Sequence, residues 1–538
     1  MMTPSANGSV TTHFALSSLG GRPERKTALL IAPPVYDTQY WAEWSQPYGL
    51  LRVAALLKKH RYKKLWLYDF METGADRKVT YHRINPDEGY QENNWPDGKT
   101  RPIVLTKGNE TLELQKKHFG KSWVNFEEYL KRRHLNRASP PTEVWVSAVM
   151  TYWWESTRDL IARLHRYFGK RTTIILGGIY PSVAPAHAAA MTGADIVVQG
   201  EIEEANDLWP DLTLYKNKPT YAIVTPSRGC PYDCHYCAQK TINSGVTRVR
   251  FRKPTDVVAE MHDKYERYGI RDFAFYADFL LFDWRNNLLP ILREIVLSKL
   301  PLRLYAPEGL DTRFLSQSQE LLDWMKKAHF QKIYLPVESI DNEYVKVLNR
   351  RHVKLEHFVR AARMCDQAGF ELRNLDVNAF VLYGLPNEEI DRVVKTTLFV
   401  SEIVGSIIPM LFTPVPSTVL YDTHLPFFRQ RGWDKNLHML NGKLYPFLET
   451  CEGSLSDYID LQRLMFTLNA HYRSESFSIF GNSKVNLSLR ENIRNGFESF
   501  VHSYKSSSLS QESGSITPMD YDSVSAVAPT SPLKILDN

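Results

Sequence analysis

The stretch Ser227-Arg-Gly-Cys-Pro-Tyr-Asp-Cys-His-Tyr-Cys-Ala-Gln239 places Cys230, Cys234 and Cys237 in a C-x3-C-x2-C pattern. The short apolar segment Tyr221 to Val224 precedes it and predicts a strand that leads into a loop. Three thiolates this close together can bind one metal centre, and thiolates favour iron–sulfur clusters, zinc or copper(I). Because a [4Fe–4S] cube needs four ligands, three cysteines would leave one iron open to a substrate or cofactor.

Zinc and a disulfide are the alternatives for these cysteines. A structural zinc site needs a fourth ligand, and His235 is the only one nearby. It stands between Cys234 and Cys237, where chain geometry makes joint ligation awkward, and the sequence has no second C-x2-C pair. A disulfide would leave one thiol over and would require an oxidising compartment. The spacing therefore favours a cluster.

The run Cys230-x3-Cys234-x-Tyr236-Cys237, with an aromatic residue before the last cysteine, resembles the signature of radical S-adenosylmethionine (radical SAM) enzymes. In that family the three cysteines hold a [4Fe–4S] cluster, and the amino and carboxylate groups of SAM chelate the open iron. One electron from the cluster cleaves SAM to methionine and a 5′-deoxyadenosyl radical. The resemblance implies that Tyr236 lies at the SAM site and that an electron donor such as flavodoxin or ferredoxin supplies the electron.

Composition limits the other classes of protein. The 538 residues suggest about three or four domains, and 43% hydrophobic residues suffice for sizeable cores. The net charge of +6 is spread along the chain, and clusters such as Lys131-Arg132-Arg133 and Arg350-Arg351-His352 are typical of solvated helix faces, so nucleic-acid binding is not expected. No apolar run approaches the roughly 18 residues of a membrane span. Only five cysteines, three of them clustered, predict a cytoplasmic protein.

Residues 27–207 alternate strand and helix patterns and predict a Rossmann-like, doubly wound parallel sheet. A polar insertion at about 75–140 interrupts them and is expected to be partly helical between Asn109 and Arg133. Ligands on such sheets bind at the carboxyl ends of strands, near the topological switch point. The predicted strands are 28–33, 64–69, 144–149, 172–176 and 195–198.

The order of motifs in this region resembles the cobalamin-binding (B12-binding) domain that precedes many radical SAM cores. That domain often shows D-x-H-x2-G, S-x-L and G-G. Ser147 and the pair Gly177-Gly178 match the last two, and Asp69 begins the first, but Met71 stands where the axial histidine belongs. The resemblance implies that cobalamin contacts these residues, without a protein base under its cobalt. The alternative is a Rossmann-like domain that has lost the cofactor.

Residues 215–421 contain six strand–helix units and predict a partial (β/α)6 barrel, the fold that the radical SAM resemblance also implies. Chemistry in such barrels lies at the carboxyl ends of the strands. Asp278, Glu338 and Gly384 follow three of these strands, and the resemblance assigns them to SAM binding. Thr413-Pro-Val-Pro-Ser-Thr418 resembles a T-P-x-P-G-T turn of the cobalamin-linked branch, with Ser417 in the glycine position.

The ends of the chain differ in composition from these two regions. Residues 1–26 and 505–538 are rich in Ser and Thr and are expected to be disordered. Residues 422–504 predict a small, mainly helical C-terminal domain with helices from Leu455 to His471 and from Leu487 to Tyr504.

The resemblance implies a cobalamin-dependent radical SAM methyltransferase that acts on an unreactive carbon of a small molecule or natural product. Two alternatives stay open. The first is a radical SAM enzyme that rearranges or cyclises its substrate without cobalamin, which the absent histidine favours. The second, of another class, is a non-catalytic iron–sulfur or zinc protein that binds a partner. Cleavage of SAM would distinguish the first from the second.

Overall fold

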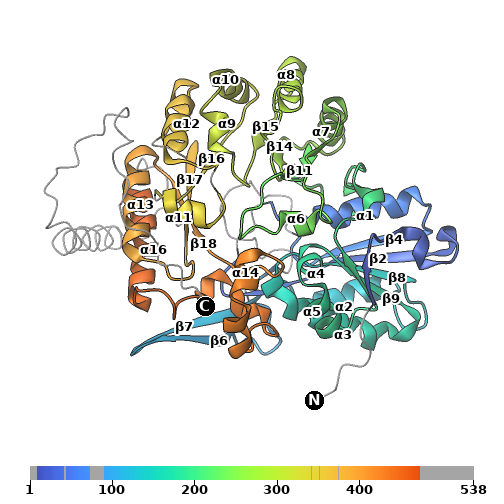
Figure 1. The fold of residues 1–538 in the computed structure, drawn as a ribbon. Helices are drawn as coiled ribbons and strands as arrows, with labels where there is room; N and C mark the ends of the chain where they lie inside the picture. The colour runs from blue at the N-terminus through green and yellow to red at the C-terminus, as the bar shows by residue number, and fades with distance from the viewer. Residues whose placement is uncertain are drawn as a thin grey trace, which may run out of the picture. The chain divides into compact units, whose positions relative to one another are not determined.

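We examined the fold in a computed structural model, which describes residues 9–40, 44–72, 90–91, 93–340, 342–350, 352–372 and 375–472. The chain forms two compact units. Unit 1 consists of residues 1–105, 112–282 and 413–446, and unit 2 of residues 106–111, 283–412 and 447–538. Both contain helices and strands, so the prediction of an α/β chain is confirmed (Figure 1).

A parallel six-stranded sheet forms the centre of unit 1. Its strand order is β1-β10-β9-β8-β2-β4, and every neighbouring pair is parallel. The side chains of residues 28–31 in β2 are fully buried, as expected for a central strand that helices cover on both faces. The strands are β1 (Ser9–Thr12), β2 (Thr27–Ala32), β4 (Lys64–Asp69), β8 (Glu143–Ser147), β9 (Thr173–Gly177) and β10 (Ile196–Gln199).

Helices cover both faces of this sheet. Figure 1 shows α1 (Tyr48–Lys59) on one side and α3 (Trp154–Phe168) and α5 (Pro185–Thr192) on the other. Each of α1 and α3 buries an apolar stripe whose members recur three or four residues apart, such as Leu160, Ile161 and Leu164 in α3. The short helix α4 (Ile179–Val183) begins directly after the double glycine.

The N-terminal segment corrects one prediction. Ser9–Thr12 pairs in parallel with Ile196–Gln199 and adds a sixth strand to the sheet, and two 3₁₀ turns follow, at Leu16–Leu19 and Pro23–Arg25. The expectation of a disordered lead-in is therefore wrong for residues 9–25, and residues 1–8 lie outside the described residues. The strand is short and polar, and only pairing with β10 distinguishes it from a loop.

The insertion is partly helical, as predicted, because helix α2 (Trp123–Arg132) lies within the expected range. Helix α2 starts after Ser122, whose side chain caps it by accepting from the Asn125 N–H. Residues 101–121 form a β-hairpin, which the sequence pattern does not indicate. Gly108, with φ +58°, opens the two-residue loop of the hairpin, where type II′ turns favour glycine. The strands here are β3 (Val35–Asp37), β5 (Tyr90–Gln91), β6 (Arg101–Lys107) and β7 (Glu110–Lys121); β7 runs antiparallel to β3 and β5.

Two further strands of unit 1, β11 (Tyr221–Val224) and β14 (Asp272–Phe275), pair in parallel. Helix α7 (Pro254–Tyr268) connects them by a βαβ crossover. The remaining elements of unit 1 are β12 (Ser227–Arg228), α6 (Gln239–Ile242), β13 (Arg250–Phe251), α14 (Val419–Thr423) and α15 (Leu425–Gln430).

Unit 2 contains the parallel sheet β16-β17-β18, whose strands alternate with helices along the chain. The predicted helix from Leu455 agrees with α16, whereas the predicted helix from Leu487 and the tail lie outside the described residues. The strands are β15 (Arg303–Tyr305), β16 (Ile333–Glu338), β17 (Val377–Tyr383) and β18 (Ile407–Leu411). The helices are α8 (Leu288–Ser298), α9 (Thr312–Leu315), α10 (Gln319–Lys327), α11 (Asn342–Val347), α12 (Leu355–Gln367), α13 (Ile390–Ile403) and α16 (Leu455–Tyr472).

Candidate functional site

The cysteine loop follows β11 and β12 in unit 1. Cys234 is buried, Cys230 is partly exposed and Cys237 is exposed, and none of the five cysteines, all within the described residues, forms a disulfide. The Cys237 N–H donates to the Cys234 carbonyl at 3.0 Å, which closes a turn between the last two cysteines. Three soft thiol donors therefore lie on one compact and accessible loop.

The donor set of this loop fits a cluster by its chemistry. Within the described part of the chain, no three His, Cys, Asp or Glu side chains surround a position suited to a single ion. A [4Fe–4S] cube makes a different demand, because each of its thiolate ligands binds a different iron. Cys230, Cys234 and Cys237 can supply three of the four ligands that such a cube requires.

Asp278 anchors the start of the loop. One of its carboxylate oxygens, Oδ2, accepts hydrogen bonds from the Gly229 N–H at 2.6 Å and from Asn243 Nδ2 at 2.8 Å. Gly229 has φ +95°, and a Cβ there would lie 2.3 Å from the Arg248 carbonyl oxygen, so only glycine fits before Cys230. The resemblance assigns Asp278 to SAM binding, whereas in the structure its carboxylate accepts a hydrogen bond from the backbone at the start of the cysteine loop.

The turn at residues 413–418, together with α14 directly after it, contacts the cysteine loop and the end of α4. The Leu420 N–H donates to the His235 carbonyl at 2.9 Å. Ser417 Oγ donates to the Val183 carbonyl at 2.8 Å, at the end of α4. The turn therefore joins the cysteine loop to the segment that follows the double glycine.

The two glycines at the end of β9 have different surroundings. Gly178 has φ +112°, and a Cβ there would lie 2.3 Å from the Ala148 carbonyl oxygen, so the approach of the chain itself requires glycine. A Cβ on Gly177 would meet no atom within 4 Å. Gly177 pairs in register with Ser147 on β8, so these two predicted cobalamin contacts are neighbours. The open side of Gly177 gives a ligand close access to the backbone.

Exposed apolar side chains follow the ends of β8 and β9. Val149 and Met150, which follow β8, are each 39% exposed, and Ile179, which follows the double glycine, is 38% exposed. Large apolar side chains this exposed at the carboxyl ends of parallel strands are suited to an apolar ligand face.

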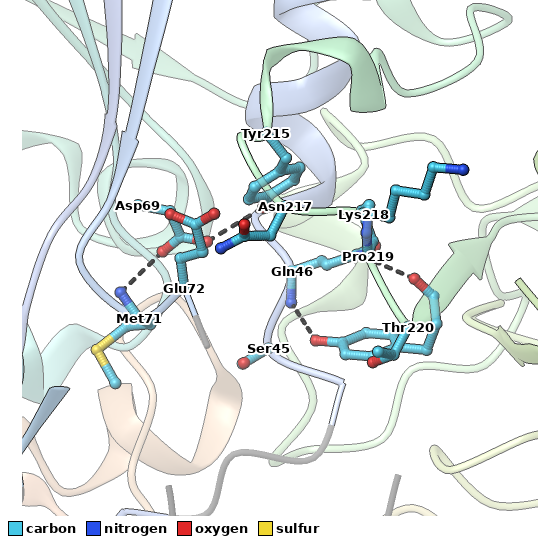
Figure 2. A pocket seen from close by; sticks show the side chains of 11 residues that line it. Ser45, Gln46, Asp69, Met71, Glu72, Tyr215, Asn217, Lys218, Pro219 and Thr220 are labelled. Carbon is cyan, nitrogen blue, oxygen red and sulfur yellow. Dashed lines mark hydrogen bonds between the residues drawn. The ribbon is translucent and has the colours of Figure 1, made fainter. Parts of the chain in front are cut away.

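Asp69 lies apart from these residues, at the end of the edge strand β4. Its carboxylate accepts from the Met71 N–H at 2.9 Å and from Tyr215 Oη at 3.1 Å (Figure 2). Burial, assisted by the nearby Glu72 carboxylate, raises the pKa of Asp69 to about 6. Met71 packs in a buried cluster with Val35 and Phe119. The structure does not bring Asp69 beside Ser147, because β2 separates β4 from β8.

Asp69 and Glu72 line a small pocket, which Figure 2 shows. Its cavity of about 40 Å³ is far smaller than the roughly 300–1,000 Å³ typical of cofactor sites. Gln46 crosses it and bonds Tyr221 through its side chain, at 2.8 Å to the carbonyl oxygen. Gln46 therefore holds the start of β11, and the pocket is too small for a cofactor of ordinary size.

Asp37 is a buried carboxylate that the sequence analysis missed. It is the last residue of β3, which follows β2 at the point where the order of strands reverses, and it is 2% exposed. Trp153 Nε1 donates to it at 2.9 Å, Asn441 Nδ2 at 3.0 Å and Lys443 Nζ at 2.8 Å. Asn441 and Lys443 lie more than 400 positions away in sequence, so no local pattern could indicate these contacts.

In unit 2, Glu338 ends β16 at a bulge and has φ +62°. Arg350 donates to its carboxylate at 2.9 Å, and the two side chains are 17% and 10% exposed for Arg350 and Glu338, respectively. The prediction that the cluster at residues 350–352 is a solvated helix face is therefore wrong for Arg350. The contact with Arg350 fixes the position of the Glu338 carboxylate.

Gly384 lies in a second compact turn of unit 2. It has φ +83°, and its N–H donates to Glu388 Oε2 at 2.8 Å. Tyr458 Oη also donates to this carboxylate, at 3.1 Å. Glu388 is 1% exposed, and burial raises its pKa to about 7. In the structure, the glutamate of this Gly-x-Pro-x-Glu motif closes the turn by accepting from the glycine N–H.

A comparison with protein families decides the assignment. Residues 224–400 match the family model described as the Radical SAM superfamily. This part of the chain is a radical SAM domain. The match begins in β11, includes the whole cysteine loop and the positions of Asp278, Glu338 and Gly384, and ends in α13.

Two curated relatives of this radical SAM chain are methyltransferases by name. An uncharacterized methyltransferase of Synechocystis sp. is 27% identical over 121 residues, or 22% of each chain. The hopanoid C-2 methylase of Rhodopseudomonas palustris is 23% identical over 150 residues, or 27% of each chain. The chain thus matches about a quarter of the length of these relatives.

Among solved structures, the radical SAM methyltransferase TsrM of Kitasatospora setae is similar over 74% of this chain and 75% of that one, with 16% identity and a TM-score of 0.49.

The radical SAM domain implies two cofactors. A radical SAM enzyme uses a [4Fe–4S] cluster and SAM.

Among the residues that the structure describes, no helix is both long and apolar enough to span a membrane.

Proposed function

We propose that this radical SAM enzyme is a cobalamin-dependent methyltransferase that acts on an unactivated carbon of a small molecule or natural product. In this proposal residues 27–207 are a cobalamin-binding-type Rossmann domain, residues 215–421 a partial (β/α)6 radical SAM barrel, and residues 422–504 a helical C-terminal domain. The observation that carries the proposal is the open, apolar surface at Gly177, in the same compact unit as the cysteine loop.

Strand order supports a ligand site at this surface. From β2 the chain adds β4 on one side, and then returns to add β8, β9 and β10 on the other, where β1 pairs with β10. Open parallel sheets bind ligands at the carboxyl ends of the strands beside such a reversal. Ser147 and Gly177 lie at these ends, and Val149, Met150 and Ile179 present apolar surface there.

The residues present fit cobalamin without a protein base. Ser147 and Gly177 would hold it, whereas Asp69 and Gly178 have structural roles. Met71, in the histidine position, is buried against Val35 and Phe119. When bound, cobalamin supplies a carrier for a methyl group between SAM and the substrate. Both curated relatives named above are methyl-transferring by name, which supports the same reaction here.

The roles of the chain's other residues follow from their positions. Cys230, Cys234 and Cys237 hold the cluster, with Asp278 fixing the first turn of the loop. Tyr236, Glu338 and Gly384 contact SAM in this proposal, and the ion pair with Arg350 orients the Glu338 carboxylate. A flavodoxin or ferredoxin would supply the electron.

Anaerobic purification with cluster reconstitution and added hydroxocobalamin tests the proposal. We expect about four irons per chain, retained cobalamin by cobalt analysis and visible spectrum, and formation of 5′-deoxyadenosine. Four irons without cobalamin would instead favour the second candidate, a radical SAM enzyme without cobalamin, which the buried Met71 supports. Absence of SAM cleavage would leave a non-catalytic iron–sulfur protein.

A matched variant sharpens this test. Gly177→Val adds a side chain where the protein has space and where strand geometry suits valine, so the fold and the cluster should persist. The new side chain would occupy the face on which we place cobalamin, so cobalamin retention should fall to near background. Retention equal to wild type would place cobalamin elsewhere or exclude this surface.

A further inference from the structure

Glu201 is a buried carboxylate just beyond β10, with its side chain only 3% exposed. Arg250 donates to this carboxylate through two nitrogens, Nη1 at 2.7 Å and Nη2 at 3.1 Å. Arg228 Nε binds the same carboxylate at 2.9 Å. Bidentate guanidinium–carboxylate pairing is strong and geometrically specific, so Glu201 fixes the positions of both arginines.

The two arginines lie at the base of the cysteine loop. They are directly paired residues of β12 and β13, and Arg228 precedes Cys230 by two positions. Arg250 also connects Glu201 towards Asp278, which anchors the start of the loop. Its Nη2 donates to Asn243 Oδ1 at 3.0 Å.

Asn243 completes a continuous chain of hydrogen bonds. Its Nδ2 donates to Asp278 Oδ2 at 2.8 Å, and the same oxygen accepts from the Gly229 N–H at 2.6 Å. Asn243 is fully buried, and its amide has only one orientation that satisfies both Arg250 and Asp278. A carboxylate at the end of the N-terminal sheet is thereby connected to the peptide group that precedes Cys230.

We propose that Glu201 is a positioning residue for the iron–sulfur cluster, acting through Arg250, Asn243 and Asp278 on the backbone before Cys230. Gly229 is held in a left-handed conformation by these contacts, and Cys230 takes its direction from Gly229. Without Glu201 the arginine side chains lose their common partner, and the loop gains freedom at its first ligand. This role depends on the cluster but not on cobalamin or on methyl transfer.

Iron retention and the EPR spectrum of the reduced cluster test this role in the full-length, reconstituted protein. Glu201→Gln and Asn243→Ala should each release iron to a chelator about five-fold faster than wild type or more, since losing one such anchor is a modest change in free energy. Both should also change the EPR line shape, with and without SAM. Glu143→Gln is the matched control, because Glu143 is equally buried and pairs with Lys26 at the other end of the same sheet.

The two variants separate position from charge. Glu201→Gln removes a negative charge near the loop, whereas Asn243→Ala removes none, so a change confined to Glu201→Gln would reduce the effect to electrostatics and overturn the positioning role. Iron release equal to that of Glu143→Gln would also overturn it. If Asn243→Ala fails to fold by circular dichroism, Arg250→Lys takes its place, since it keeps the charge but loses the bidentate geometry. A wild-type protein that holds no cluster would contradict the cofactor assignment itself.

Discussion

Ser417 shows how a single residue can replace glycine at a strained position. Its φ of +65° lies in the left-handed region, which costs residues other than glycine about 1 kcal/mol or more. Its hydroxyl donates to the Val183 carbonyl, a bond that contributes about 1 kcal/mol. The side chain therefore offsets part of the strain that its own Cβ creates.

A pair of substitutions separates these two effects. Ser417→Ala keeps the strain and loses the hydrogen bond, so it should lower stability by about 1 kcal/mol. Ser417→Gly loses the same bond but relieves the strain, so it should be nearly neutral. Thermal melts of the two variants measure the difference, and equal melting temperatures would contradict the strain at this position.

Glu388 gives stability a pH dependence with a defined sign. Burial raises its folded pKa to about 7, above the value of about 4.3 in an unfolded chain. The folded state therefore keeps a proton that the unfolded state loses between these pH values, and stability falls as pH rises through this window. Glu388→Gln should be more stable than wild type at pH 8, by up to about 3 kcal/mol, and similar at pH 4.

Melts at several pH values check this expectation. Glu389→Gln is the control, because the Glu389 side chain is half exposed and lies one residue away. If Glu388→Gln and wild type lose stability equally between pH 5 and pH 8, the buried carboxyl is not the source of the dependence.

At the scale of elements, the contact between β8 and the start of α4 depends on Gly178. An alanine there would combine a left-handed φ of +112° with a Cβ 2.3 Å from the Ala148 carbonyl oxygen. We expect Gly178→Ala to lower stability by about 1–3 kcal/mol. Gly177→Ala, with open space at its Cβ, should stay within about 0.5 kcal/mol of wild type. Similar melts for the two variants would contradict this distinction.

The sequence predicts some elements well because their signal is local. The strands β2, β8, β9 and β10 are short apolar runs, and the alternation with helices leaves few folds to consider. The hairpin at residues 101–121 is missed because its residues are largely polar and charged, and the Gly108-Asn109 loop is its main local sign. Strand β1 is missed because only its partner β10 makes it a strand.

The candidate site divides in the same way. The spacing of Cys230, Cys234 and Cys237 is visible in the sequence and agrees with the family match. The Glu201–Arg250 and Arg350–Glu338 pairs are not visible, because each joins residues that only the folded chain brings together. Sequence reasoning therefore finds the loop that carries the chemistry and misses the contacts that hold it.

At the scale of the whole molecule, Lys443 neutralises Asp37 across 406 positions of sequence. Lys443→Met should lower stability by about 3 kcal/mol, because it leaves a buried carboxylate without its cation. Adding Asp37→Asn to this variant removes the uncompensated charge and should recover a large part of the loss. A double variant no more stable than Lys443→Met would show that the ion pair is not the source of the effect.

Unit 1 is discontinuous, and this limits how the protein can be shortened. Residues 413–446 lie beyond most of unit 2 in sequence, yet they supply Asn441 and Lys443 to Asp37 and the turn that contacts the cysteine loop. A fragment that stops at β18 would leave the Asp37 carboxylate without Asn441 and Lys443 and would remove the Leu420 contact with the cysteine loop. No single cut in the sequence separates unit 1 from unit 2, so gene fusions must keep both ends of unit 1 together.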